Sequence, residues 1–104
     1  MSVVKRELKK IHSVIGADNV FFHFKKLRGQ HGLCYRTPIS ETDNRFVIVI
    51  DPKKEFFSTL LHECSHCIYI KAPEKESRKL EALMMRHITT KQILDTLRHF
   101  CENA

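Results

Sequence analysis

Two histidines and a glutamate in one short stretch carry the most chemistry in this sequence. Residues 59–68 read TLLHECSHCI and contain an H-E-x-x-H pentad made by His62, Glu63 and His66. Residues four apart lie on one face of a helix, so both imidazoles could bind one cation. Glu63 could hold and deprotonate a water molecule on that cation. Two imidazoles, a nearby carboxylate and an open position for water are what a hydrolytic zinc site needs.

The residues around the pentad strengthen this prediction, because the pentad alone could arise by chance. Shuffled versions of this His- and Glu-rich composition would contain it in roughly 3% of cases. Within residues 59–68, Glu63 is the only Asp, Glu, Lys or Arg, and no proline interrupts the segment. The alternative is a fortuitous pair of histidines on a helix surface.

Length and composition predict a single soluble domain over residues 1–104. The chain has 42% hydrophobic and 29% charged residues, which is ordinary for a globular protein. Its net charge of +6 is compatible with loose attraction to nucleic acid or acidic partners. The basic residues are scattered, however, and a solvated surface explains them without a nucleic-acid site.

Nothing in the sequence indicates export or a membrane span. Residues 1–10 are charged and lack the apolar segment of a secretory signal, and the longest aliphatic run covers residues 46–50. We therefore expect a cytoplasmic protein. Without an export signal, the four cysteines do not predict a disulfide framework; they are Cys34, Cys64, Cys67 and Cys101.

The pattern of apolar residues predicts an α+β fold. A first helix is expected over residues 2–16, with Ser2 as its cap and an apolar stripe of Val4, Leu8, Ile11 and Ile15. Three strands are expected over residues 20–26, 33–37 and 45–50. Pro38 places the second strand at a sheet edge, and the unbroken apolar run of the third predicts a central strand buried on both faces.

Three further helices are expected after the strands. Asp51 and Pro52 predict the start of the helix that carries the pentad, which would reach about Ile70 beneath the sheet. A third helix is expected over residues 74–88. Thr89 or Thr90 would cap the fourth, with an inward stripe of Ile93, Leu94, Leu97 and Phe100.

A catalytic zinc ion usually has three protein ligands, so a third residue is needed. If the third helix returned antiparallel from a turn near Lys71, Glu81 would lie beside the two histidines. Glu74 and Glu76 would remain at the turn, and His87 would lie about two turns too far. Glu81 also stands among apolar neighbours, where an unpaired carboxylate is costly. We predict Glu81 as the third ligand, with His87 in reserve and an exposed surface glutamate as the alternative.

These features resemble the minigluzincins, small zincin metallopeptidases with a downstream glutamate ligand. The resemblance rests on the pentad, Glu81, the chain length and the element order, and covers nearly the whole chain. It implies a minimal zincin scaffold with one catalytic Zn²⁺ held by His62, His66 and Glu81. It implies that Glu63 is the general base and acid in peptide-bond hydrolysis. SprT-like proteases, with histidine as third ligand at similar spacing, are a neighbouring group.

A metallopeptidase would act on a peptide or protein, which the edge strand could bind by strand addition. Tyr69 and Tyr35 are candidates for a second oxyanion donor, although packing roles are more common for tyrosine. Minigluzincins are described as proforms, so Cys101 near the C-terminus could occupy the open position and keep the enzyme latent. The alternative is a tail cysteine without a role.

The competing function is a basic module that binds nucleic acid or protein and holds a structural or vestigial zinc site. Cys64 and Cys67 form a C-x-x-C inside the pentad helix. A thioredoxin-like motif would open a helix after a strand, so we interpret both as small core residues.

Overall fold

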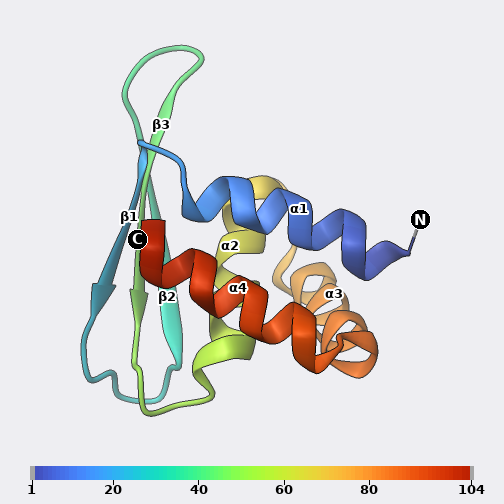
Figure 1. Ribbon diagram of the computed structural model, residues 1–104. Coiled ribbons are helices and arrows are strands. Elements are labelled where there is room, and N and C mark those ends of the chain that lie inside the picture. Colours follow the sequence, from blue (N-terminus) through green and yellow to red (C-terminus); the bar gives the residue numbers. More distant parts are fainter. Residues whose placement is uncertain (1, 104) are drawn as a thin grey trace.

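The computed structural model describes residues 2–103, which form four helices and one three-stranded sheet (Figure 1). The chain order is α1 (Val3–Ile15), β1 (Val20–Phe24), β2 (Gly32–Pro38), β3 (Asn44–Ile50), α2 (Phe56–Ile68), α3 (Glu74–His87) and α4 (Thr90–Asn103). The predicted α+β class and element order are confirmed. Among residues 2–103, no helix has the length and apolar composition that crossing a membrane requires.

The sheet places β3 between the other two strands, in the order β1-β3-β2. β1 runs parallel to β3, and β2 runs antiparallel to it. Phe22 of β1 and Cys34 of β2 both pair with Ile48 of β3, which fixes the register across the sheet. The predictions of a central third strand and an edge second strand are therefore confirmed.

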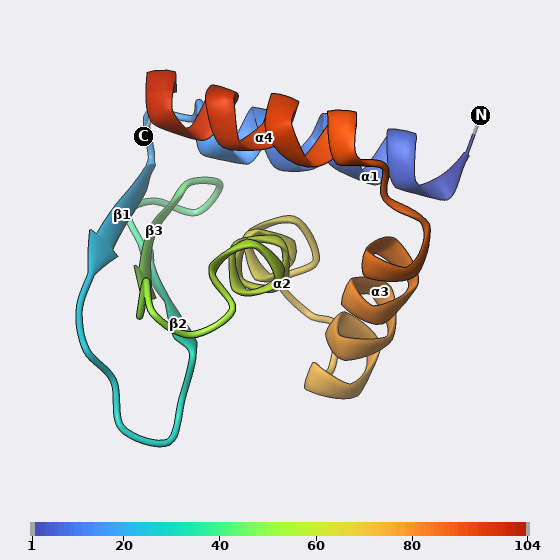
Figure 2. The ribbon, with the colours of Figure 1, turned by 60° about the horizontal axis from the view of Figure 1, so that its bottom comes forward.

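All four helices lie on one side of the sheet, as Figure 2 shows. α2 packs directly against β2 and β3, and α1 contacts α2, α3 and α4. Among residues 2–103, no helix covers the other face of the sheet, which corrects the prediction that β3 is buried on both faces. Phe46, Ile48 and Ile50 of β3 are buried under the helices, whereas Val47 and Val49 are only half-buried.

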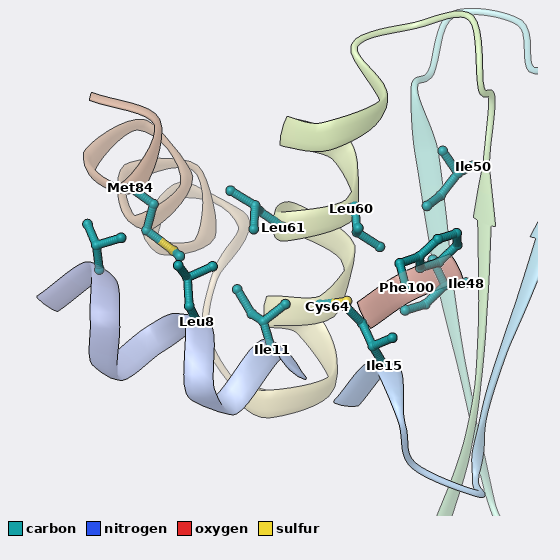
Figure 3. Close-up of a cluster of buried hydrophobic side chains, with 11 residues drawn as sticks. Leu8, Ile11, Ile15, Ile48, Ile50, Leu60, Leu61, Cys64, Met84 and Phe100 are labelled. Atoms are coloured by element: carbon teal, nitrogen blue, oxygen red, sulfur yellow. The ribbon is translucent and has the colours of Figure 1, made fainter. Parts of the chain in front are cut away.

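The core fills the space between α1, α2 and the inner face of the sheet (Figure 3). Leu60, Leu61 and Cys64 of α2 are at most 1% exposed, so one side of α2 is fixed among apolar side chains. Val4, Leu8, Ile11 and Ile15 are buried, as the apolar stripe of α1 predicts. Burying such side chains contributes about 1.5–3 kcal/mol each, and this fixes α2 relative to the sheet.

The helix caps predicted for α1 and α4 form. The Ser2 hydroxyl accepts a hydrogen bond from the Lys5 amide. Thr89 caps α4 reciprocally with Gln92, because each side chain accepts a hydrogen bond from the other's backbone amide. The stripe predicted for α4 is partly wrong: Leu94 is 61% exposed, and Thr96 is fully buried.

The start of α2 differs from the prediction by four residues. The helix begins at Phe56, not Pro52, after a turn in which the Asp51 carboxylate accepts hydrogen bonds from the Leu27 and Lys53 amides. Asp51 therefore connects the end of β3 to the loop after β1 instead of capping the helix. Glu55 occupies the N-cap position in the left-handed region, with φ 44°, and its side chain makes no capping hydrogen bond.

Candidate metal centre

The two pentad histidines of α2 are not part of the apolar core cluster, and their side chains are 12% and 24% exposed. His62 and His66 are one helical turn apart, and their Nε2 atoms are 3.2 Å apart. Two ligands at about 2.0–2.1 Å from a tetrahedral zinc ion are roughly 3.3–3.4 Å apart. The spacing of the two imidazole nitrogens therefore fits a shared zinc ion.

The carboxylate of Glu74 lies against both imidazoles. Its Oε1 is 2.7 Å from His62 Nε2, and its Oε2 is 3.1 Å from His66 Nε2. Within residues 2–103, His62, His66 and Glu74 form the one group whose ligand atoms are close enough together to hold a metal ion. Two imidazoles and one carboxylate are a donor set that catalytic zinc uses.

This position of Glu74 contradicts the expectation that it would remain at the turn. The expectation assumed that α3 runs back antiparallel to α2. Figure 2 shows α2 almost along its axis while α3 lies across the view, so the two helices cross. Since α3 begins at Glu74, directly after Pro73, its first residue already lies beside the histidines.

Glu81 reaches His62, as predicted, but it approaches the other ring nitrogen. Its Oε1 is 2.9 Å from His62 Nδ1. The angle between Glu81 Oε1 and the His62 ring does not suit a hydrogen bond. Among the described residues, the buried His62 Nδ1 therefore has no hydrogen-bond partner. Glu81 is therefore a neighbour of His62, whereas Glu74 contacts both histidines.

The structure also contradicts the expected apolar surroundings of Glu81 and places His87 away from the two histidines. Leu83 and Met85 are 38% and 40% exposed, so the apolar sequence around Glu81 is not an apolar environment. Only Met84 in this stretch is fully buried. His87, the reserve ligand, is exposed at the end of α3 and does not belong to the group that could hold a metal ion.

Glu63 lies next to the cluster with an environment suited to proton transfer. Its side chain is buried, at 5% exposed for the residue, between α2 and the start of β2. Burial raises the pKa of Glu63 to about 7; the carboxylates of Glu74 and Glu81 add to this effect and His62 opposes it. A carboxyl group with a pKa near neutrality can both accept and return a proton.

The absence of a side chain at Gly32 gives Glu63 its space. A Cβ atom at Gly32 would lie 2.7 Å from Thr59 Cγ2 and 3.0 Å from Glu63 Oε2. The first residue of β2 therefore packs directly against the carboxylate. This contact cannot be predicted from the sequence, because nothing local to Gly32 indicates which part of α2 it meets.

The protonation states of the cluster favour metal binding. Burial, and then the neighbouring His62, lower the pKa of His66, which favours the neutral imidazole that binds metals. Partial burial acts against ionisation of Glu74, yet the two histidines and Arg78 together hold its pKa below the ordinary value. The site therefore presents a neutral imidazole and an ionised carboxylate.

A cleft of about 840 Å³ opens over this cluster. Its walls come from the loop at residues 29–31, from β2, from α2 and from the beginning of α3. β2 contributes Gly32, Leu33, Cys34 and Arg36, and this strand pairs with β3 along one edge only. The edge strand predicted to bind an extended peptide thus borders the cleft that contains the histidines.

The two tyrosines considered as oxyanion donors lie outside the cleft. The Tyr69 hydroxyl donates to the Glu7 carboxylate on α1, at 2.8 and 2.9 Å, and accepts from the Lys10 ammonium. Tyr35 is 54% exposed, and neither tyrosine lines the cleft. Arg36 and Arg78 are the cations among the cleft-lining side chains that could face a developing negative charge.

The cysteines also separate into different environments. Cys64 is fully buried, which confirms its interpretation as a core residue, whereas Cys67 is half-buried and contacts Cys34 of β2. Cys101 is exposed on α4, next to Phe100, which packs against Phe22 of β1. β1 is the sheet edge opposite β2, and Cys101 does not line the cleft.

Comparison of the chain with models of protein families, with curated proteins and with solved structures gave no match. The resemblance to minigluzincins therefore stays a prediction from the sequence. What the geometry adds is a group of two imidazoles and a carboxylate that could hold a metal ion, beside a buried glutamate.

Proposed function

We propose that this chain is a zinc-dependent metallopeptidase with a zincin-type site. The observation that carries the proposal is the convergence of three candidate ligand side chains in the lining of one cleft, with Glu63 buried beside them. The mixed sheet supports it, since its antiparallel edge strand borders the same cleft. In this proposal His62, His66 and Glu74 hold the ion.

Each residue has a separate task in the proposed reaction. A bound zinc ion would supply the Lewis acidity that activates a water molecule and polarises the substrate carbonyl. Glu63 takes a proton from the attacking water and gives it to the leaving amine, a role that fits its buried position beside the three ligand side chains. Gly32 leaves room for this carboxylate, and the free edge of β2 aligns an extended peptide.

The proposed function is tested with Glu63→Gln, which keeps the size of the side chain and removes its basicity. We expect this variant to bind zinc as the wild type does, because Glu63 is not a ligand. Its cleavage of a broad peptide library should be slower by about 10²–10⁴-fold, the usual contribution of general acid–base catalysis. Zinc content is measured by elemental analysis and cleavage by mass spectrometry.

Glu41→Gln is the matched control, since Glu41 is exposed in the loop before β3 and does not line the cleft. It should cleave at the wild-type rate. Equally poor cleavage by wild type and Glu63→Gln, with zinc bound to both, would contradict the peptidase proposal. Strong, salt-sensitive DNA binding in that case would favour a binding module or an SprT-like role instead.

A further inference from the structure

Two cysteine thiols meet where β2 packs against α2. Cys34 Sγ of β2 and Cys67 Sγ of α2 are 3.8 Å apart, and both residues are half-buried. Cys34 also lines the cleft, so small molecules can reach it. The two residues are 33 positions apart in the chain, and their contact exists only because the fold brings the strand to the helix.

We propose that Cys34 and Cys67 form a redox modification site, at which an intramolecular disulfide links the edge strand to the pentad helix. A disulfide has an S–S distance of about 2.05 Å, so the two sulfur atoms must approach by roughly 1.8 Å. At 3.8 Å the two sulfur atoms already lie close to van der Waals contact. The proposal does not depend on the proposed function, since neither a metal ion nor peptide cleavage is needed for the bond.

The reaction can be written with oxidised glutathione, a small-molecule disulfide, as the oxidant. The Cys34 thiolate attacks one sulfur atom, the glutathione S–S bond breaks, and one glutathione leaves as a thiolate. The Cys67 thiolate then attacks Cys34 Sγ in the mixed disulfide and releases the second glutathione. The two cysteines lose two electrons to glutathione, and their two protons end on the two glutathione thiols.

The other two cysteines are poorly placed for this reaction. Cys64 is 0% exposed within the core, where an oxidant has no access to it. Cys101 is exposed on α4, beside the opposite edge of the sheet. The pair Cys34 and Cys67 combines contact between the sulfur atoms with access from the cleft. The bond would connect a cleft wall to the last turn of the helix that carries His62 and His66.

The test uses the full chain with Cys101→Ser, which removes the exposed thiol that could join two molecules. The protein is treated with EDTA and then with oxidised glutathione. This chain has three cysteines, and we expect the free thiols counted after denaturation to fall from three to one. The intact mass should fall by two hydrogen atoms without added glutathione, and the phosphine TCEP should restore all three thiols.

Tryptic digestion then locates the bond. Cleavage after Arg28 and Arg36 leaves Cys34 in the peptide 29–36, and cleavage after Lys54 and Lys71 leaves Cys64 and Cys67 together in the peptide 55–71. We expect these two peptides to be cross-linked, and fragmentation between Ser65 and His66 should assign the bond to Cys67. In the same background, Cys67→Ser and Cys34→Ser should each abolish the cross-link.

Several outcomes would overturn the proposal. One is an unchanged thiol count after oxidation, and another is a product that carries glutathione adducts alone. A bond that maps to Cys64, or an intramolecular bond that survives in the Cys67→Ser variant, would do the same. If Cys34→Ser disturbs the start of β2, the Cys67→Ser variant still tests the proposal.

Discussion

Glu74 and Glu81 approach different nitrogens of the His62 ring. Glu74 contacts Nε2, which faces His66, and Glu81 lies 2.9 Å from Nδ1. In metal sites the second nitrogen of a histidine ligand commonly faces a carboxylate that fixes the orientation of the ring. We therefore propose the ligand role for Glu74, and for Glu81 an orienting role that requires its carboxylate to align with Nδ1 when a metal ion is bound.

These roles predict different losses of zinc affinity. Glu81→Gln should weaken zinc binding by about 10–100-fold, the usual effect of removing an orienting partner. Glu74→Gln should weaken it more, because a charged ligand is lost. Competition with a chelator of known affinity measures both. Should Glu81→Gln cause the larger loss, Glu81 is the third ligand, as the sequence alone suggested.

At the scale of elements, the contact between β2 and α2 determines the space around the Glu63 carboxylate. Gly32→Ala would place a methyl group 2.7 Å from Thr59 and 3.0 Å from Glu63. We expect the free energy of unfolding to fall by about 1–3 kcal/mol, as overpacked cores show. Peptide cleavage should fall as well, because Glu63 must move.

Gly16→Ala is the control for this substitution, because an added Cβ there meets its nearest atoms at ordinary distances of 3.7 and 3.8 Å. Denaturant unfolding compares the two variants with the wild type. If Gly32→Ala unfolds at the same denaturant concentration as Gly16→Ala, the close packing of Glu63 against β2 is contradicted.

The contact between α1 and α4 predicts a loss of stability in acid. Burial, and then His99, lower the pKa of His12, against a smaller opposite effect of Asp95. The unfolded chain therefore binds a proton at this residue more readily than the folded one. The contribution of neutral His12 is present above its ordinary pKa of 6.5 and is lost as the pH falls below it.

The measurement is the Tm of the metal-free protein between pH 8 and pH 5. His12→Gln can keep a hydrogen bond to the Thr96 hydroxyl, which is 2.8 Å from His12 Nε2 in the wild type. We expect Tm to fall less with acidity in this variant than in the wild type. His23→Gln, at an exposed position of β1, should behave like the wild type. Equal acid dependence in all three proteins would refute the prediction.

At the scale of the whole molecule, the candidate ligands join two helices that cross. His62 and His66 belong to α2 and Glu74 to α3, so an ion bound there would hold the two helices together. Zinc at one hundred times its dissociation constant should stabilise the fold by about 2.7 kcal/mol. For a domain of this size that raises Tm by roughly 10–20 °C.

Thermal unfolding with zinc and with EDTA tests this coupling. The wild type should show the rise in Tm, and EDTA should reverse it. His66→Ala should show little change, since it lacks one of the three ligands. A rise of the same size in His66→Ala would mean that zinc acts elsewhere in the chain.

The sequence by itself determined the features that depend on local periodicity. The apolar stripe of α1 and the helical pentad follow from residue spacing, whereas Pro38 and the apolar run of β3 predicted the edge and central positions in the sheet; all four are confirmed. The start of α2 was misplaced, because Asp51 and Pro52 suit a turn as well as a helix start. The neighbouring residues do not distinguish a turn from a helix start, because the Asp51 carboxylate accepts its hydrogen bond from the Leu27 amide, 24 residues away in the chain.

Tertiary structure alone decided which side chains meet the histidines. The angle between α2 and α3 is set by how their side chains pack with α1, and the short turn before Glu74 is compatible with several angles. An antiparallel return would have favoured Glu81, whereas the crossing brings Glu74 to both imidazoles. The spacing of His62 and His66 is local to one helix, but the third candidate ligand is decided by packing between helices.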